Sequence, residues 1–214
     1  MIIIYWHCLG MTEADETFVN SALKELAQHL KEDQIKLTIS VKRLASEPDL
    51  VREVNEVLNK PNDQSSGFSY YVAMILGIFS CHVGVGQPFT YMRLLVYCHQ
   101  DSQVAKAAKS EAARMNKAPP CWGAANSPLA AAYKVGSKVA VWHEALHLLG
   151  ADDCYIEDDP YQKKPDCELD GCIMEYAPLE STCENWPFLC DENIKKLKDT
   201  AEKAKEVRRT KKDS

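Results

Sequence analysis

The feature that most constrains this sequence is a short stretch at residues 141–153, which reads VWHEALHLLGADD. It contains the pattern HExxHxxGxxD. Residues four apart share one face of a helix, so His143 and His147 can present two imidazole nitrogens to a single metal ion. Glu144 lies beside them, close enough to polarise a metal-bound water without being a ligand itself. The stretch therefore predicts a metal centre on a helix.

The glycine and the aspartate of the pattern complete the predicted centre. Gly150 can adopt the positive φ that ends a helix, so the chain can turn back and bring a third ligand from Asp153. Three protein ligands with one open position are the arrangement of catalytic zinc. Asp152 and Cys154 are the neighbouring candidates for the third ligand, and the spacing favours Asp153.

The stretch resembles the metzincin metalloproteases, whose signature is HExxHxxGxxH followed by a turn that contains methionine. Residues 172–176 read CIMEY and match that turn, so the resemblance implies that Met174 forms a hydrophobic floor beneath the metal. This chain departs at the third ligand, where most members have histidine and Asp153 stands instead. An aspartate there is similar to the snapalysin-type proteases, whereas the cysteines nearby look like those of archaemetzincins. The resemblance covers residues 137–177.

The resemblance implies a zinc-dependent metalloendopeptidase that hydrolyses peptide bonds with a metal-bound water. Glu144 would act as the general base and then pass the proton to the leaving amine. Tyr176 follows the methionine by two residues; it would either approach the metal and help to hold the oxyanion, or be a core tyrosine. Because Asp153 makes the centre less positive than a third histidine would, we expect a higher pH optimum than in an all-histidine relative.

Other interpretations stay open at this point. A distant ligand, Glu168 or Glu175, would define a gluzincin-like site, but Gly150 and Met174 would then have no role. The functional alternatives are a catalytically inactive zinc-binding protein of the same fold and a metal-dependent hydrolase of a non-peptide amide. Glu144 argues against a purely structural centre, which needs no positioned base.

The cysteines suggest a further feature of the C-terminal part. The chain has nine, an odd number, so at least one has no partner within the chain. By resemblance to archaemetzincins, the C-terminal cysteines could hold a second, structural zinc, although the CxxC pair of that family is missing here. Disulfides are the alternative, and they would point to an oxidising compartment. The residues concerned are Cys154, Cys167, Cys172, Cys183 and Cys190.

Composition sets the remaining limits. A chain of 214 residues, 46% hydrophobic and 26% charged, suits one catalytic domain, which we divide into an N-terminal lobe (1–150) and a C-terminal lobe (151–214). The net charge of −6 argues against nucleic acid as a partner. No apolar run is long enough for a membrane span. The first residues lack the features of a signal peptide, so we expect a cytoplasmic monomer, or a secreted one if a signal has been removed.

Periodicity predicts an α/β (α+β) metzincin-like fold: a mixed twisted sheet with helices, the active-site helix, and a small loop-rich lobe that ends in a helix. Strands are predicted at 1–6, 35–44, 68–79 and 90–98, and helices at 13–30, 46–58, 102–116, from 137, and from 191. Thr12 and Asp15 supply a capping box for the first helix, Ser137 can cap the helix from 137, and each of these two helices carries an apolar stripe. An antiparallel edge strand at 81–87 would pair with an extended peptide substrate. We expect irregular chain at 117–136, a solvated acidic loop at 152–170, and a frayed basic end at 208–214.

Overall fold

A five-stranded sheet forms the centre of the protein, with strand order β2-β1-β3-β5-β4. The computed structural model describes residues 2–9, 12–42, 92–98, 123–126, 129–132, 136–156, 159–175, 182 and 188–212. Neighbouring strands run parallel except β4, which pairs antiparallel with β5 at one edge. The strands are β1 (Ile2–Leu9), β2 (Leu37–Lys42), β3 (Met92–Cys98), β4 (Gly123–Asn126) and β5 (Leu129–Ala132).

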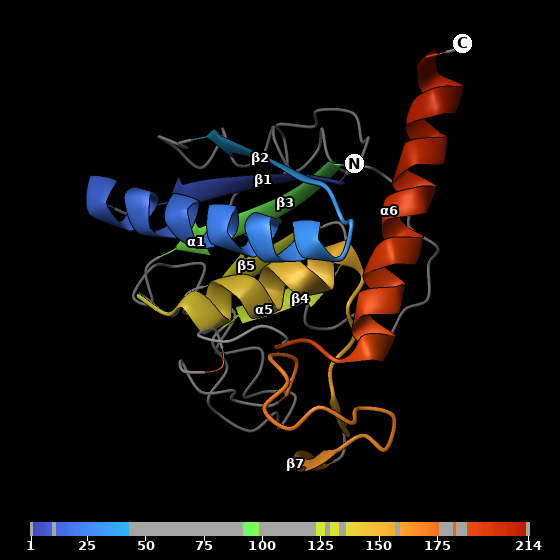
Figure 1. Ribbon diagram of the computed structural model, residues 1–214. Helices are drawn as coiled ribbons and strands as arrows, with labels where there is room; N and C mark the ends of the chain where they lie inside the picture. The colour runs from blue at the N-terminus through green and yellow to red at the C-terminus, as the bar shows by residue number, and fades with distance from the viewer. Residues whose placement is uncertain are drawn as a thin grey trace, which may run out of the picture.

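Two helices lie side by side on one face of this sheet (Figure 1). α1 (Glu13–Glu32) begins at a capping box in which Thr12 and Asp15 satisfy each other's backbone N–H groups. α5 (Lys138–Leu149) packs on β3, β4 and β5 and against α1. The indole N–H of Trp142 donates to the Ala22 carbonyl at 2.7 Å, which fixes α5 to α1. Both helices present the apolar stripes that the sequence predicts, and these stripes are buried.

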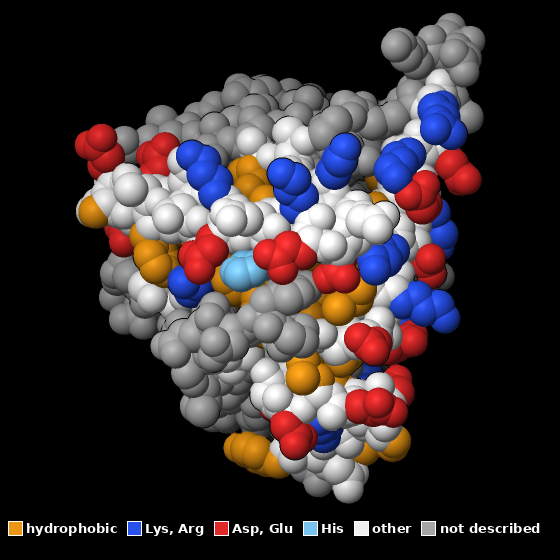
Figure 2. Space-filling view, viewed as in Figure 1, with side chains coloured by type: hydrophobic (Ala, Val, Ile, Leu, Met, Phe, Trp, Pro, Cys, Tyr) orange, Lys and Arg blue, Asp and Glu red, His pale blue; other side chains and the backbone are white. Residues whose placement is uncertain are grey.

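The C-terminal part consists of a small two-stranded sheet and a long helix. β6 (Tyr155–Ile156) and β7 (Asp159–Lys163) pair antiparallel. α6 (Asp191–Lys212) runs along the side of the molecule, and its outer surface carries alternating acidic and basic side chains (Figure 2). α6 contacts α5, and its buried side chains include Leu197, Ala201 and Ala204. This contact places the first turn of α6 next to the end of α5.

Three expectations are wrong. Residues 117–136 contain β4 and β5, whose sequences GAAN and LAAA have little intrinsic strand preference; β5 forms by pairing with β3, and β4 by pairing with β5. The acidic stretch 152–170 contains β6 and β7 rather than only a loop. The basic end is helical as far as Lys212, where cations favour the negative end of the helix dipole.

Several other predictions concern residues outside the described part of the chain. These are the helices at 46–58 and 102–116, the strand at 68–79 and the edge strand at 81–87. In the described sheet, the antiparallel edge strand is β4, which comes shortly before α5. None of the described helices combines the length and apolar character that a membrane crossing requires.

Candidate metal centres

The end of α5 is built to turn the chain back toward the helix. At the start of α5, the Ser137 side chain accepts from the Ala140 N–H, as an N-cap residue does. At its end, Gly150 has φ 106°, a left-handed conformation that residues with a Cβ rarely adopt. The Gly150 N–H then bonds to the His147 carbonyl at 3.0 Å, and the Ala151 N–H to the Leu146 carbonyl at 3.0 Å. Both predicted caps are confirmed, and the turn brings Asp153 to the histidines.

Three side chains converge at this turn. The two histidine Nε2 atoms, of His143 and His147, lie 3.1 Å apart. Asp153 Oδ1 lies 3.4 Å from the first of these atoms and 3.1 Å from the second. All three side chains are partly buried, and they form a group that could hold a metal ion. The structure therefore brings together the three ligands that the sequence predicts.

The hydrogen bonds made by the Nδ1 atoms of the two imidazoles determine whether the Nε2 atoms have a free lone pair. His143 Nδ1 lies 2.8 Å from the Ile173 carbonyl, and His147 Nδ1 lies 2.9 Å from the Ala151 carbonyl. A carbonyl can only accept, so each Nδ1 carries the proton and each neutral ring leaves a lone pair on Nε2. Metal-binding histidines make this kind of outer hydrogen bond. Two lone pairs and the Asp153 carboxylate thus face one point, an arrangement that could hold a cation.

The charge balance at this point agrees with that arrangement. Burial favours the neutral form of Asp153, but the adjacent imidazoles of His143 and His147 outweigh it and hold its pKa well below the usual range. Burial also disfavours protonated His147, yet Asp153 raises the pKa of this imidazole above its ordinary value. Asp153 Oδ1 is buried and has no hydrogen-bond donor among the described residues. An orphaned carboxylate oxygen between two imidazole lone pairs is the donor set of a zinc ligand group.

Glu144 stands beside this group with an unused carboxylate oxygen. The residue is buried, and its Oε2 has no hydrogen-bond partner among the described residues. Burial raises the pKa of Glu144 from 4.5 to about 8, against the lowering effect of His143. A buried acid with a raised pKa next to a metal centre can both take up and release a proton near neutral pH.

The other residues considered as the third ligand are exposed or make other contacts. Asp152 is exposed and forms an ion pair with Lys196 at 2.9 Å. Glu168 is exposed, and Glu175 Oε1 accepts from the N–H groups of Gly171 and Cys172. Of the candidates that the sequence left open, the geometry brings only Asp153 to the two imidazoles.

The turn at 172–175 is joined by hydrogen bonds to residues around the histidine centre. Met174 is fully buried, and its carbonyl accepts from the Cys154 N–H at 2.7 Å. The preceding Ile173 accepts from His143 and donates its own N–H to the Phe188 carbonyl at 2.8 Å. These hydrogen bonds connect the turn to α5, to the segment that contains Asp153 and Cys154, and to the segment before α6. Tyr176 lies outside the described residues.

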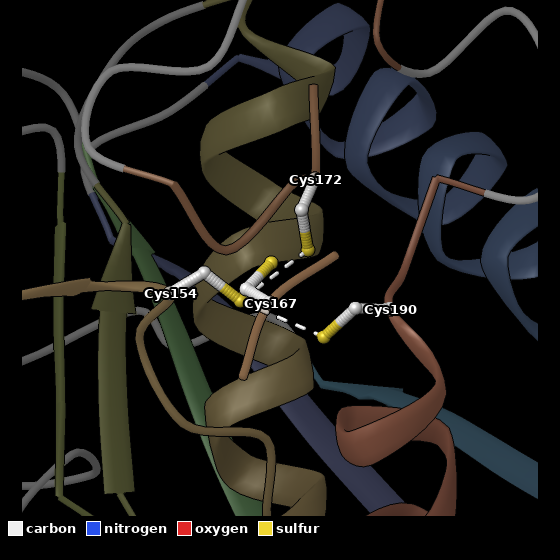
Figure 3. A group of neighbouring side chains, drawn as sticks. All are labelled: Cys154, Cys167, Cys172 and Cys190. Atoms are coloured by element: carbon white, nitrogen blue, oxygen red, sulfur yellow. Dashed lines mark hydrogen bonds between the residues drawn. The ribbon is translucent and has the colours of Figure 1, made fainter. Parts of the chain in front are cut away.

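Four cysteines form a second group that could hold a metal ion. Cys154, Cys167, Cys172 and Cys190 are buried, free of disulfides, and have all their sulfur atoms within 4.8 Å of one another. The sulfurs point toward one region between the end of α5 and the start of α6 (Figure 3). Cys183 lies outside the described residues.

The spacing of the sulfurs fits a tetrahedral metal better than a disulfide. Cys154 Sγ lies 3.5 Å from Cys172 Sγ and 3.6 Å from Cys190 Sγ. Four sulfurs at zinc–thiolate bond length stand about 3.8 Å apart, whereas a disulfide bond is about 2 Å long. A hydrogen bond from Cys154 is the main cause that lowers the pKa of Cys172 to about 6. This lowering favours the thiolate, the form of cysteine that binds a metal.

Asn193 is a contributor that the sequence gave no reason to select. It is buried in the first turn of α6, and an asparagine near the start of a helix is normally interpreted only as favouring that start. Its Oδ1 accepts from the Asp152 N–H at 2.8 Å, and its Nδ2 donates to the Asp152 carbonyl at 2.9 Å. The same Nδ2 lies 3.4 Å from Cys154 Sγ. Its partners lie about forty positions earlier in the chain, so no local pattern could reveal this role.

Comparison of the chain with protein-family models and with curated protein sequences finds no match. The assignment of a function therefore rests on the geometry of the two centres.

Proposed function

We propose that this protein is a zinc-dependent endopeptidase of metzincin type, in which His143, His147 and Asp153 hold the catalytic zinc. The observation that carries the proposal is the convergence of two Nε2 lone pairs and an orphaned carboxylate oxygen on one point. The buried Glu144 beside that point, whose Oε2 has no hydrogen-bond partner among the described residues, supports catalysis rather than a purely structural centre.

Zinc in such a centre supplies a Lewis acid that activates a water molecule near neutral pH. Glu144 takes the proton from the attacking water and delivers it to the leaving amine as the peptide bond breaks. The Nδ1 hydrogen bonds of His143 and His147 to backbone carbonyls keep both rings in the orientation that binding requires. Met174 closes the floor of the centre, and Tyr176 is proposed as an aid to the oxyanion.

The substrate is proposed to be a peptide bound as an extended strand. β4 is the antiparallel edge strand of the described sheet, and α5 packs directly against it. An exposed strand edge offers backbone hydrogen bonds to a peptide regardless of its sequence. We therefore propose β4 as a strand for substrate pairing; the segment at 81–87, predicted for the same role, lies outside the described residues.

A second zinc is proposed at Cys154, Cys167, Cys172 and Cys190, with a structural role. Four thiolates fill all positions of a tetrahedral zinc and leave none for a substrate. Cys167, which follows β7, and Cys190, which precedes α6, would take the places of the missing CxxC pair. This centre would fasten the C-terminal lobe to the end of α5.

The test compares wild type with Glu144→Gln, using metal analysis and cleavage of a peptide library. We expect two zinc ions in both proteins and a loss of about 100- to 10,000-fold in the cleavage rate of the variant, the range that general acid–base catalysis supplies. Glu168→Gln, at an exposed position, is the matched control and should retain full activity. Equal cleavage by Glu144→Gln would refute the mechanism. Zinc without cleavage in wild type would favour an inactive binding protein, and hydrolysis confined to non-peptide amides would favour the other alternative.

A further inference from the structure

The two candidate centres share a short segment of backbone. Asp153 belongs to the histidine centre and the next residue, Cys154, belongs to the cysteine centre. A second link runs through the turn: His143 donates to the carbonyl of Ile173, which directly follows Cys172. At the first link, the two ligands are consecutive residues. At the second link, one hydrogen bond joins His143 to Ile173, the residue next to Cys172.

The shared segment is fixed on both sides of Asp153. Asn193 binds both the N–H and the carbonyl of Asp152. The Cys154 N–H donates to Met174, and the Cys154 carbonyl accepts from Lys164 at 2.9 Å. The backbone around the third ligand is therefore positioned by groups that belong to the surroundings of the cysteine centre.

Among the described residues, the Asn193 side chain joins this segment to a ligand of the cysteine centre. Its Nδ2 reaches both the Asp152 carbonyl and Cys154 Sγ. An amide N–H beside a thiolate stabilises the negative charge that metal binding creates. The side chain is buried, so these bonds form with little competition from water.

We propose that Asn193 is a positioning residue that couples the two metal centres, so that a metal bound by the four cysteines raises the affinity of the histidine centre. This inference rests on the proposed function, because it requires a metal at both centres. When the cysteines bind a metal, Cys154 and Cys172 become fixed. Asp153 and the Ile173 carbonyl are then held where the histidine centre needs them. The coupling is reciprocal, as linkage requires.

The experiment titrates the metal-free protein with Co²⁺ against a competing chelator and follows the absorption spectrum. Thiolate-to-cobalt charge transfer in the near ultraviolet reports the cysteine centre, since a His/His/Asp set produces no such band. Asn193→Leu keeps the branched arrangement of heavy atoms and removes all three contacts, and we expect it to lower cobalt affinity at both centres by about 10- to 100-fold. Asn193→Asp keeps the acceptor and loses the donor, so it should weaken the cysteine centre more than the histidine centre.

Two further variants make the result decisive. Lys196→Met also removes a contact of α6 with Asp152, but only at its exposed carboxylate, so it should leave both affinities unchanged. Cys190→Ser removes one sulfur ligand of the cysteine centre and leaves Asn193 and its three contacts in place, and it should lower the affinity of the histidine centre by about 10-fold. Unchanged affinity of the histidine centre in both Asn193→Leu and Cys190→Ser would overturn the coupling while leaving the proposed function intact. Failure of wild type to bind cobalt at all would overturn both proposals.

Discussion

Gly150→Ala tests the turn that delivers Asp153 to the histidines. At φ 106°, an alanine would occupy a left-handed conformation, which costs a residue with a Cβ about 1–2 kcal/mol. The added Cβ would also stand 2.5 Å from Thr200 Oγ1, well inside normal contact distance. Thr200 must then rotate and give up its 2.9 Å hydrogen bond to the Lys196 carbonyl, or α6 must move away from α5.

The energetic cost of the contact with Thr200 depends on which adjustment occurs, rotation of the Thr200 side chain or movement of α6. Loss of the hydrogen bond costs about 1 kcal/mol, and overpacking between helices costs about 1–3 kcal/mol. We therefore expect Gly150→Ala to lower the free energy of unfolding by about 2–5 kcal/mol. Gly136→Ala is the matched control at the other end of α5: its φ is 72°, and an added Cβ meets no described atom within 4 Å. It should cost only about 1–2 kcal/mol.

Urea unfolding followed by tryptophan fluorescence measures these differences, and Thr200→Ala completes a double-mutant cycle. Without Oγ1, the nearest remaining Thr200 atom is its Cβ at 3.5 Å, an ordinary contact. Gly150→Ala should then cost no more than Gly136→Ala, which gives a coupling energy of about 1–3 kcal/mol. Equal costs for the two glycine variants with Thr200 present, or a coupling energy near zero, would refute the proposed packing of α6 against the turn.

Two further predictions concern α5. In the metal-free protein, Glu144 binds a proton in the folded state between pH 4.5 and about 8 and has lost it when unfolded, so stability should fall as pH rises through this window. Glu144→Gln removes this slope and should be more stable than wild type by an amount on the order of 4 kcal/mol at pH 8. Chelator-treated proteins unfolded in urea at pH 5 and pH 8 provide the comparison, and parallel pH dependence would contradict it. Trp142→Phe loses the hydrogen bond to Ala22 and leaves a small cavity, so it should lower the free energy of unfolding by about 1–3 kcal/mol. Thermal unfolding measures the change, and an unchanged midpoint would show that the indole N–H contributes nothing.

The parts of the fold that sequence analysis predicted depend on local chemistry. Thr12 and Asp15 cap α1, and Ser137 and Gly150 limit α5, because each cap is formed by residues within one turn of the helix. The histidine pair follows from helical periodicity alone. β4 and β5 were missed because alanine, glycine and asparagine carry no strand signal; β5 forms beside β3, and β4 forms beside β5.

The parts of the site that sequence analysis did not resolve depend on long-range contacts. The cysteine cluster could be stated only as metal ligands or disulfides, because spacing does not tell which sulfurs meet or how closely. The structure selects Cys154, Cys167, Cys172 and Cys190 and places them at metal-binding rather than disulfide distances. Asn193 could not be selected at all, since its contacts are made across 39 to 41 residues of sequence.

The position of Asp153 explains why these long-range contacts bear on the choice of third ligand. A histidine ligand can have its orientation fixed by the hydrogen bond of its second ring nitrogen, as His143 and His147 do here. A carboxylate has no such N–H group, so the direction of Asp153 must be set by its backbone. The bonds to Asp152 and Cys154 on either side supply that constraint. Asp153 can therefore take its place in the candidate metal centre because its neighbours Asp152 and Cys154 are held by Asn193 of α6 and by Met174.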